Sequence, residues 1–221
     1  MVDALIRGAP RPDHVCGASA GALVAACYGA GLRPEALGEE LSVLERGDFW
    51  DPAPGPGLLR GRLFRERLHG LLPRTFAECR TPVSVAVHDV LGRRPRALTS
   101  GSLPAAVHAS CAVPFMFRPV RVGGRLYVDG GVSDRPGVTA MPEGRVLFHH
   151  LASRSPWRRP GSESLNIPRR RGLVSLVIEG LPRVHPFRLD RGRDALAIAR
   201  RATERALDLP ICDGRVAVPV P

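Results

Sequence analysis

The chain has 221 residues, of which 44% are hydrophobic, and a formal net charge of +11. This length suits one domain with a sizeable core, and the composition fits a soluble globular protein. The sequence contains no lysine, so arginine supplies all of its Lys-plus-Arg count. A basic surface favours anionic partners such as phospholipid head groups. Nucleic acid is not expected as a partner, because no base-reading motif and no interleaving of basic with aromatic residues occurs.

Five scattered cysteines form no C-x-x-C pair, and they are Cys16, Cys27, Cys79, Cys111 and Cys212. We interpret them as buried thiols of a reducing compartment, and not as a disulfide or zinc framework. The histidines and acidic residues show no metal-ligand spacing, and no phosphate-binding loop occurs, so no metal and no cofactor are expected. Residues 1–7 lack the apolar core of a signal peptide. We therefore expect a cytoplasmic protein that can also lie at the periphery of a membrane.

The first motif along the chain is G-x-S-x-G at residues 17–21. An apolar pair before it predicts a strand, and the small apolar residues after it predict a helix over residues 20–30. In such a turn the serine has a strained backbone, and a side chain at Gly17 or Gly21 is expected to collide where strand and helix pass closely. The helix directs its free N–H groups at Ser19, which is therefore a candidate nucleophile. The alternative is a Gly/Ala-rich corner without chemistry.

Leucine spacing predicts the next two helices. Residues 34–46 form an amphipathic pattern behind a proline, and leucines recur again across residues 59–72. A proline- and glycine-rich loop at residues 47–57 separates them and carries Phe49 and Trp50. This loop either lines an acyl channel or is an ordinary connection with two packed aromatic residues.

A second candidate site residue follows a predicted hairpin. Alternating apolar residues predict a strand at 82–87, and Ser102 caps a helix that ends before Pro114. Strands at 117–122 and 125–128 then flank a pair of glycines. Asp129 stands at the C-terminal end of the second strand and is followed by Gly130 and Gly131, which let the chain turn away from its side chain. The alternative is a common Asp-Gly turn.

The remaining third predicts strands at 146–148 and 173–178, a long terminal helix and a loose tail at 216–221. Residues 152–172 are rich in Ser, Pro, Arg and Gly and predict a flexible solvated loop, or else a contact to phosphate or a membrane surface. Alternating strands and helices predict the α/β class, with a mostly parallel sheet sandwiched by helices and one domain over residues 1–221. Sites in that class lie at the C-terminal ends of strands.

Taken together and in order, these motifs resemble the patatin-like phospholipases, a family of serine acyl hydrolases with a Ser–Asp dyad. The resemblance covers about residues 13–138. Its parts are the nucleophile motif at 17–21, a central strand at 82–89, a helix and proline turn at 102–117 that include Ala109-Ser110 and Val113-Pro114, and the D-G-[AG] motif at 127–132 with Pro136.

The resemblance implies a three-layer fold and a lipid acyl hydrolase of phospholipase A or lysophospholipase type. Ser19 would attack an ester carbonyl of a phospholipid or another acyl ester, and Asp129 would take its proton with no histidine between them. The N–H of Ala20 would bind the oxyanion, and an acyl-serine intermediate would be hydrolysed by water. Gly17 and Gly21, with Gly130 and Gly131, would complete the two motifs.

One family feature is missing from the sequence. Family members carry a glycine-rich loop, G-G-G-x-[RK]-G, after a first strand and before the nucleophile, and none of the 16 residues before Gly17 reads so. Met1 would fall inside the helix that follows that loop. We expect either a longer native protein with a misplaced start, which we favour, or a truncated form with weak or no activity.

Two rival functions stay open at this point. A catalytically impaired or silent module that binds lipid or protein would explain the missing glycine loop. A Ser-His-Asp enzyme of the α/β-hydrolase kind shares G-x-S-x-G and would combine Asp129 with His149, His150 or His185.

Overall fold

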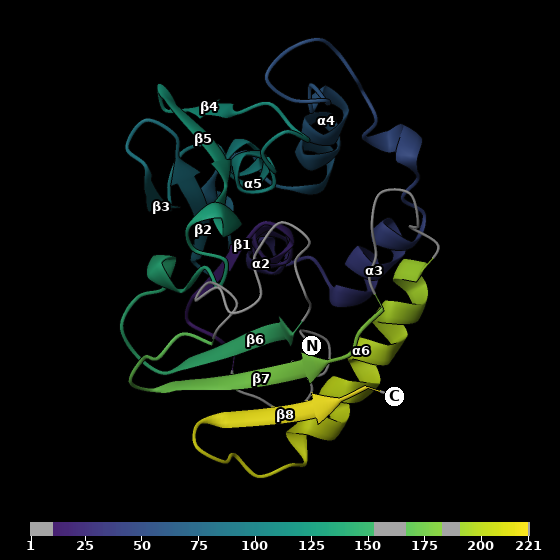
Figure 1. Cartoon of the computed structure of the whole chain (residues 1–221), viewed down its shortest axis with the longest axis vertical. Coiled ribbons are helices and arrows are strands. Elements are labelled where there is room, and N and C mark those ends of the chain that lie inside the picture. The colour runs from purple at the N-terminus through teal and green to yellow at the C-terminus, as the bar shows by residue number, and fades with distance from the viewer. Residues whose placement is uncertain (1–10, 153–166, 183–190, 221) are drawn as a thin grey trace. The chain divides into compact units, whose positions relative to one another are not determined.

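The computed structural model describes residues 11–152, 167–182 and 191–220 (Figure 1). Two compact units make up the chain: one is Pro12–Pro142, and the other consists mainly of Glu143–Pro221. The predicted helix end at residues 1–7, and most of the loop predicted at residues 152–172, lie outside the described residues. That one domain covers residues 1–221 stays a prediction.

The unit Pro12–Pro142 contains five strands and four α-helices, and the patterns described above predict the four helices and all strands except β3 in the same order. The strands are β1 (Val15–Ala18), β2 (Val83–Asp89), β3 (Arg94–Leu98), β4 (Val120–Val122) and β5 (Arg125–Asp129). The α-helices are α2 (Ala20–Ala30), α3 (Pro34–Ser42), α4 (Arg62–Leu71) and α5 (Leu103–Ser110). Short 3-10 turns are η1 (Arg46–Asp48), η2 (Phe76–Glu78), η3 (Gly130–Val132) and η4 (Val138–Ala140).

Strand β2 is the centre of the five-stranded sheet, and both of its edges are paired (Figure 1). On one edge, β3 runs antiparallel to it over Val85–Asp89. On the other, β1 runs parallel to it until Ala18 lies opposite Ala86, and β5 runs antiparallel to it until Asp129 lies opposite Val87. Because a strand residue has only two edges and β3 takes one of them, β1 and β5 share the other and meet end to end.

Short connections account for the antiparallel pairs of this sheet. β4 turns into β5 through Gly123 and Gly124, whose φ values of 54° and 80° suit a tight hairpin turn. Residues 90–93 join β2 to β3 in the same short way, and such connections can join only antiparallel strands. The α/β class with helix-flanked sheets is confirmed. Within this unit, however, only β1 and β2 pair in parallel, and the other strand pairs are antiparallel.

Helices α2 and α5 cover one face of the five-stranded sheet. Val83, Val85 and Val87 alternate along β2, so their side chains point to the same face. All three are buried in one apolar cluster with the small residues of α2 and α5. This cluster is the core of the unit and fixes the two helices on which the site described below depends.

Local capping residues account for the C-terminal end of α2 and the N-terminal end of α5, whereas α3 ends earlier than predicted. α2 stops at Gly31, where a left-handed φ of 86° ends the helix, and Ser102 caps α5 by accepting a hydrogen bond from the N–H of Ala105 at 3.3 Å. The prediction for α3 is too long, because this helix ends at Ser42 and the chain continues into η1. Leu41, expected on the apolar face, is 45% exposed.

A second apolar cluster anchors the loop ahead of α4. Leu59, expected within the helix, precedes it and is fully buried beside Ala112 and Phe117. Phe49 and Trp50 pack against this cluster. This packing agrees with an ordinary connection that holds two aromatic residues, and a role of the loop in lining an acyl channel stays a prediction.

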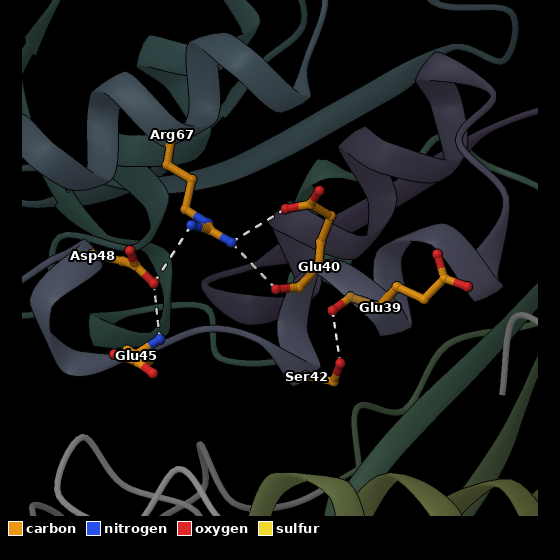
Figure 2. A network of polar contacts seen from close by, with 6 residues as sticks. All are labelled: Glu39, Glu40, Ser42, Glu45, Asp48 and Arg67. Atoms are coloured by element: carbon orange, nitrogen blue, oxygen red, sulfur yellow. Dashed lines mark hydrogen bonds and ion pairs between the residues drawn. The ribbon is translucent and has the colours of Figure 1, made fainter.

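A network of surface charges joins α3, η1 and α4, as Figure 2 shows. Arg67 donates to the carbonyl oxygen of Glu40 at 3.3 Å and to its carboxylate at 3.2 Å, and its second terminal nitrogen lies 3.5 Å from Asp48. Asp48 also accepts a hydrogen bond from the backbone N–H of Glu45 at 2.8 Å. Since these side chains are partly exposed, each ion pair contributes about 1 kcal/mol or less to stability.

The second unit holds a parallel sheet of order β6 (Val146–Ala152), β7 (Leu173–Glu179) and β8 (Arg215–Pro219), with α6 (Arg191–Leu207) packed on β7 and β8 (Figure 1). The predicted strands and terminal helix are confirmed. The loose tail expected at residues 216–221 is wrong for residues 216–219, which belong to β8. Buried Val216 and Val218 alternate there with exposed neighbours.

All five cysteines are free thiols. Burial raises the pKa of Cys16 and Cys27 to about 12 in each case, which keeps both thiols protonated at neutral pH. The expectation of burial is wrong for Cys212, which is exposed.

Candidate functional site

Ser19 lies at the sharp turn between β1 and α2. Its φ of 55° and ψ of −127° are outside the regions that non-glycine residues usually adopt. A Cβ on Gly17 would come within 2.2 Å of the carbonyl carbon of Gly21, so the first glycine is sterically required. The same expectation for Gly21 is wrong, since a Cβ there would meet nothing within 4 Å. The close contact involves the backbone of Gly21 and not its missing side chain.

The sheet gives a reason for the turn at Ser19. Ala18 pairs with Ala86, so the next position along this edge of β2 is the one opposite Val87. Asp129, arriving from the other end, occupies that position. Because β1 cannot continue, the chain leaves the sheet at Ser19 and enters α2.

Asp129 ends β5 in a buried position and is only 6% exposed. One carboxylate oxygen, Oδ1, accepts a hydrogen bond from the N–H of Gly131 at 2.7 Å, and the backbone N–H of Asp129 donates to the carbonyl of Ala112 at 2.9 Å. A Cβ on Gly130 would come within 2.3 Å of the carbonyl oxygen of Ala86. Gly130 thus allows close approach to β2, and Gly131 orients the carboxylate.

The two predicted site residues are brought together by these strand ends. A Cβ on Gly130 would lie 3.3 Å from the Cβ of Ala18, so the residues next to Asp129 and Ser19 are in contact. Asp129 pairs with Val87 and therefore shares the face that α2 and α5 cover, which is also where Ser19 opens α2. The expected geometry is corrected here: the two residues meet because strands running in opposite directions end against each other, and not at the common edge of parallel strands.

Two further groups belong to this site. Ser110, the last residue of α5, accepts a hydrogen bond from the N–H of Ser19 at 2.9 Å and donates one to the carbonyl of Ala86 at 2.6 Å. The N–H of Ala20 has no hydrogen-bond partner within the described residues, and Ala20 is exposed. Sequence reasoning named Ser110 only as part of a motif and assigned it no role.

The segment after η3 supports the turn at Ser19 from the side. The thiol of Cys16 donates to the carbonyl of Gly137 at 2.9 Å, and a Cβ on Gly137 would lie 3.1 Å from the backbone N of Ala18. Asp134 is 7% exposed and accepts hydrogen bonds from the N–H and the hydroxyl of Thr139. These contacts hold residues 134–139 against β1, and no local sequence signal identified them.

Two of the three histidines of the triad alternative belong to a different compact unit from Ser19 and Asp129, and the third is not described. His149 and His150 lie on β6, in the other compact unit. His185 lies outside the described residues. Within the unit Pro12–Pro142, His88 binds the hydroxyl of Ser133 at 2.8 Å, and His14 binds that of Ser84 at 2.8 Å.

His108 is an unusual buried residue of α5. It is 6% exposed and stands against the rings of Phe64 and Phe117. The pKa of His108 is lowered to about 4, mainly by burial and to a smaller extent by Arg65, while Asp51 opposes the shift. Neither ring nitrogen has a hydrogen-bond partner in the described part of the chain, so the ring is neutral at pH 7 and acts as a packing residue.

Neither a metal site nor a membrane-spanning helix is found in the ranges that the structure describes. No group of three or more His, Cys, Asp or Glu side chains there could hold a metal ion. No helix there is long and apolar enough to cross a membrane.

The strand, strained serine and helix form a nucleophile elbow, the turn on which serine hydrolases of α/β folds place their nucleophile. A family model described as patatin-like phospholipase matches residues 1–141, which is more than half of the chain. The chain therefore belongs to the patatin-like phospholipase family, and the predicted resemblance is confirmed.

Individual relatives agree with this family. Proteins of Mycobacterium tuberculosis and Mycobacterium bovis, each named an uncharacterized NTE family protein, are 29% identical over 124 residues, which is 54% of this chain. The aligned part is 34% of each relative, so the chain spans about a third of their length. The solved structure of VipD from Legionella pneumophila is 19% identical over 79% of this chain and 28% of VipD, with a TM-score of 0.27, and this weak likeness carries no argument.

Proposed function

We propose that the chain is a lipid acyl hydrolase of phospholipase A or lysophospholipase type, with Ser19 as nucleophile and Asp129 as general base. The observation that carries the proposal is the end-to-end meeting of β1 and β5 on one edge of β2. The strained Ser19 directly follows β1 and the buried Asp129 ends β5, where the N–H of Gly131 binds its carboxylate, and these positions support the proposed pair. Membership of the patatin-like phospholipase family supports a lipid ester as the substrate.

In this mechanism the Oγ of Ser19 attacks the ester carbonyl carbon while its proton passes to the carboxylate of Asp129. The transfer needs the two oxygens within about 3 Å of each other in a site that excludes bulk water. The leaving alcohol takes the proton from Asp129, and an acyl-serine remains. Water then loses a proton to Asp129 and attacks the acyl carbon. The bond from that carbon to the Oγ of Ser19 breaks, Oγ takes the proton back from Asp129, and the fatty acid leaves.

Negative charge develops on the carbonyl oxygen during both attacks. The N–H of Ala20 directly follows the nucleophile, opens α2 and is not used inside the described residues, so it is the donor we assign to the oxyanion. Removing one such donor costs a serine hydrolase on the order of 10²–10³ in rate. The glycine-rich loop of the family would add further donors, and the rival reading of a silent module rests on its absence from residues 1–16.

The direct test is hydrolysis of a soluble p-nitrophenyl ester by wild type, Ser19→Ala and Asp129→Asn. Both substitutions should lower kcat/KM by at least about 10³-fold without changing the melting temperature greatly. Ser133→Ala is the matched control, since Ser133 is an exposed serine of the same unit and its hydroxyl binds only His88 among the described residues. Wild-type protein that is folded but neither hydrolyses the ester nor reacts with a fluorophosphonate would support the silent module.

The triad alternative is separated by substituting histidines. Glutamine at His149, His150 and His185, singly and together, should leave hydrolysis within about threefold of wild type if the base is Asp129. Loss of activity on any one of these changes, with the fold intact, would replace the dyad by a Ser-His-Asp site.

We also infer that the chain works at a lipid surface from the cytoplasmic side. Phe115 is 85% exposed although its φ is 67°, and its carbonyl is held by the N–H of Leu58, itself 51% exposed. Phe115 also lies close in the chain to Ala112, which binds Asp129. Phe115→Ser should lower hydrolysis of phosphatidylglycerol vesicles about 10-fold and leave the soluble ester unaffected. Equal losses on both substrates would argue against a surface role.

A further inference from the structure

The break between β1 and β5 disturbs the hydrogen bonding of β2. In a continuous ladder, each backbone group on the paired edge has a partner on the neighbouring strand. Here Ala18 and Asp129 face consecutive residues of β2 and both chains then leave the sheet. The carbonyl of Ala86 lies at this break, close to Gly130, and it is bound by a side chain instead.

That side chain is Ser110, which is 0% exposed. Its hydroxyl carries one hydrogen, and donation to the carbonyl of Ala86 at 2.6 Å uses it. A lone pair of the same oxygen accepts the N–H of Ser19 at 2.9 Å. The hydroxyl therefore takes the place of the missing strand partner of Ala86. It also links the carbonyl of Ala86 to the N–H of the candidate nucleophile, Ser19.

The same turn of chain also holds the candidate base. Two residues after Ser110, the carbonyl of Ala112 accepts the N–H of Asp129 at 2.9 Å. The last residue of α5 and the turn that follows it thus bind the backbone N–H of both Ser19 and Asp129. Since α5 is packed into the core of this unit, these two hydrogen bonds fix the backbone positions of both residues against one rigid element.

The backbone of Ser19 needs such a support. A residue in this part of φ/ψ space stays there only when the surrounding structure holds it. The N–H of Ser19 is already bound by Ser110. The next donor along the chain is the N–H of Ala20, which is the one assigned to the oxyanion.

We propose that Ser110 is a positioning residue, whose hydroxyl holds the strained backbone of Ser19 at the break between β1 and β5 and so sets the nucleophile against Asp129. The inference rests on the proposed function for its catalytic consequence. Its structural part, that Ser110 retains the N–H of Ser19, stands without it.

The test compares Ser110→Ala with Ser84→Ala and Ser110→Thr. Ser84 is a matched control, because it is 2% exposed, lies on β2 and binds a side chain, His14, rather than the elbow. Ser110→Ala should lower kcat for the soluble ester about 10- to 100-fold with KM within about twofold, since Ser110 touches Ser19 and not the substrate. Ser110→Thr keeps the oxygen and should restore most of kcat.

Amide hydrogen exchange of Ser19, followed by ¹⁵N NMR, provides a measurement that does not depend on activity. This amide should be protected in wild type and in Ser84→Ala, and should exchange at least about 10-fold faster in Ser110→Ala. Unchanged exchange in Ser110→Ala, or a fall in kcat no larger than that of Ser84→Ala, overturns the proposal. An inactive wild type with the expected exchange pattern would instead refute the proposed function and leave the role of Ser110 in holding the elbow intact.

Discussion

In the three-stranded sheet, β7 pairs with β6 over its whole length, Leu173–Glu179, and with β8 over Ser175–Glu179. In the five-stranded sheet, β2 changes partners in the middle of one edge, from β1 to β5. Where pairing is continuous, the backbone groups of the strand are bonded within the ladder, and no neighbouring strand has to leave the sheet partway along it. The interrupted edge makes two chains leave the sheet at neighbouring positions, and these positions carry Ser19 and Asp129.

The largest loss of folding stability should come from a side chain added at the interrupted edge of the sheet. In Gly17→Ala the added methyl would overlap the backbone of Gly21, which cannot move without displacing α2, so unfolding in urea should show a loss of more than about 3 kcal/mol. Gly21→Ala is the matched control in the same motif. It adds a methyl in open space and should stay within about 1 kcal/mol of wild type. Equal losses in the two variants would contradict the geometry of the elbow.

Acid should weaken the unit that holds the interrupted sheet through His108. Its pKa is about 4 in the folded chain against 6.5 for an ordinary histidine, so the unfolded state binds more protons between these values. The contribution of neutral His108 is fully present above pH 6.5 and falls by about 3 kcal/mol as the pH drops to 4. Unfolding of His108→Leu should depend less steeply on pH in this window.

The exposed His69 on α4 provides the control for this pH series. His69→Leu should keep the wild-type pH dependence. If His108→Leu and wild type lose stability in parallel from pH 6.5 to pH 4, the buried ring is not the group that titrates.

The smallest effect should follow from a change in the continuous sheet. Ile178 is 1% exposed on β7, and Ile178→Val should cost about 0.5–1.5 kcal/mol of stability. Ester hydrolysis, measured well below the melting temperature, should be unchanged, because the candidate chemistry lies in Pro12–Pro142. A fall in kcat of more than about threefold in this folded variant would show that the continuous sheet takes part in the reaction.

Local patterns in the sequence predict the elements that carry the site. The strand, serine and helix at residues 15–30, and the hairpin that ends at Asp129, are found where glycine spacing and apolar alternation place them. The last strand could also have been found, because Val216 and Val218 alternate with polar or small residues. Its proximity to the chain end favoured a tail instead.

Strand direction and partner choice could not be predicted in the same way. Whether β5 joins β2 parallel or antiparallel depends on backbone hydrogen bonds between residues about 40 positions apart in the chain, and no local pattern encodes them. The role of Ser110 is hidden for the same reason, since its partners Ser19 and Ala86 are 91 and 24 residues away. Gly17 and Gly21 look equivalent in the motif, and only the packing of α2 on β1 distinguishes them.

The account depends most on the nucleophile and the base acting together, and the rate of fluorophosphonate labelling tests this directly. Mass spectrometry of the labelled protein should place the adduct on Ser19, and Asp129→Asn should slow labelling by at least about 10³-fold while the protein stays folded. Labelling of Ser19 at the wild-type rate in Asp129→Asn, or labelling of a different residue, would contradict the claim that the two strand ends form a catalytic pair.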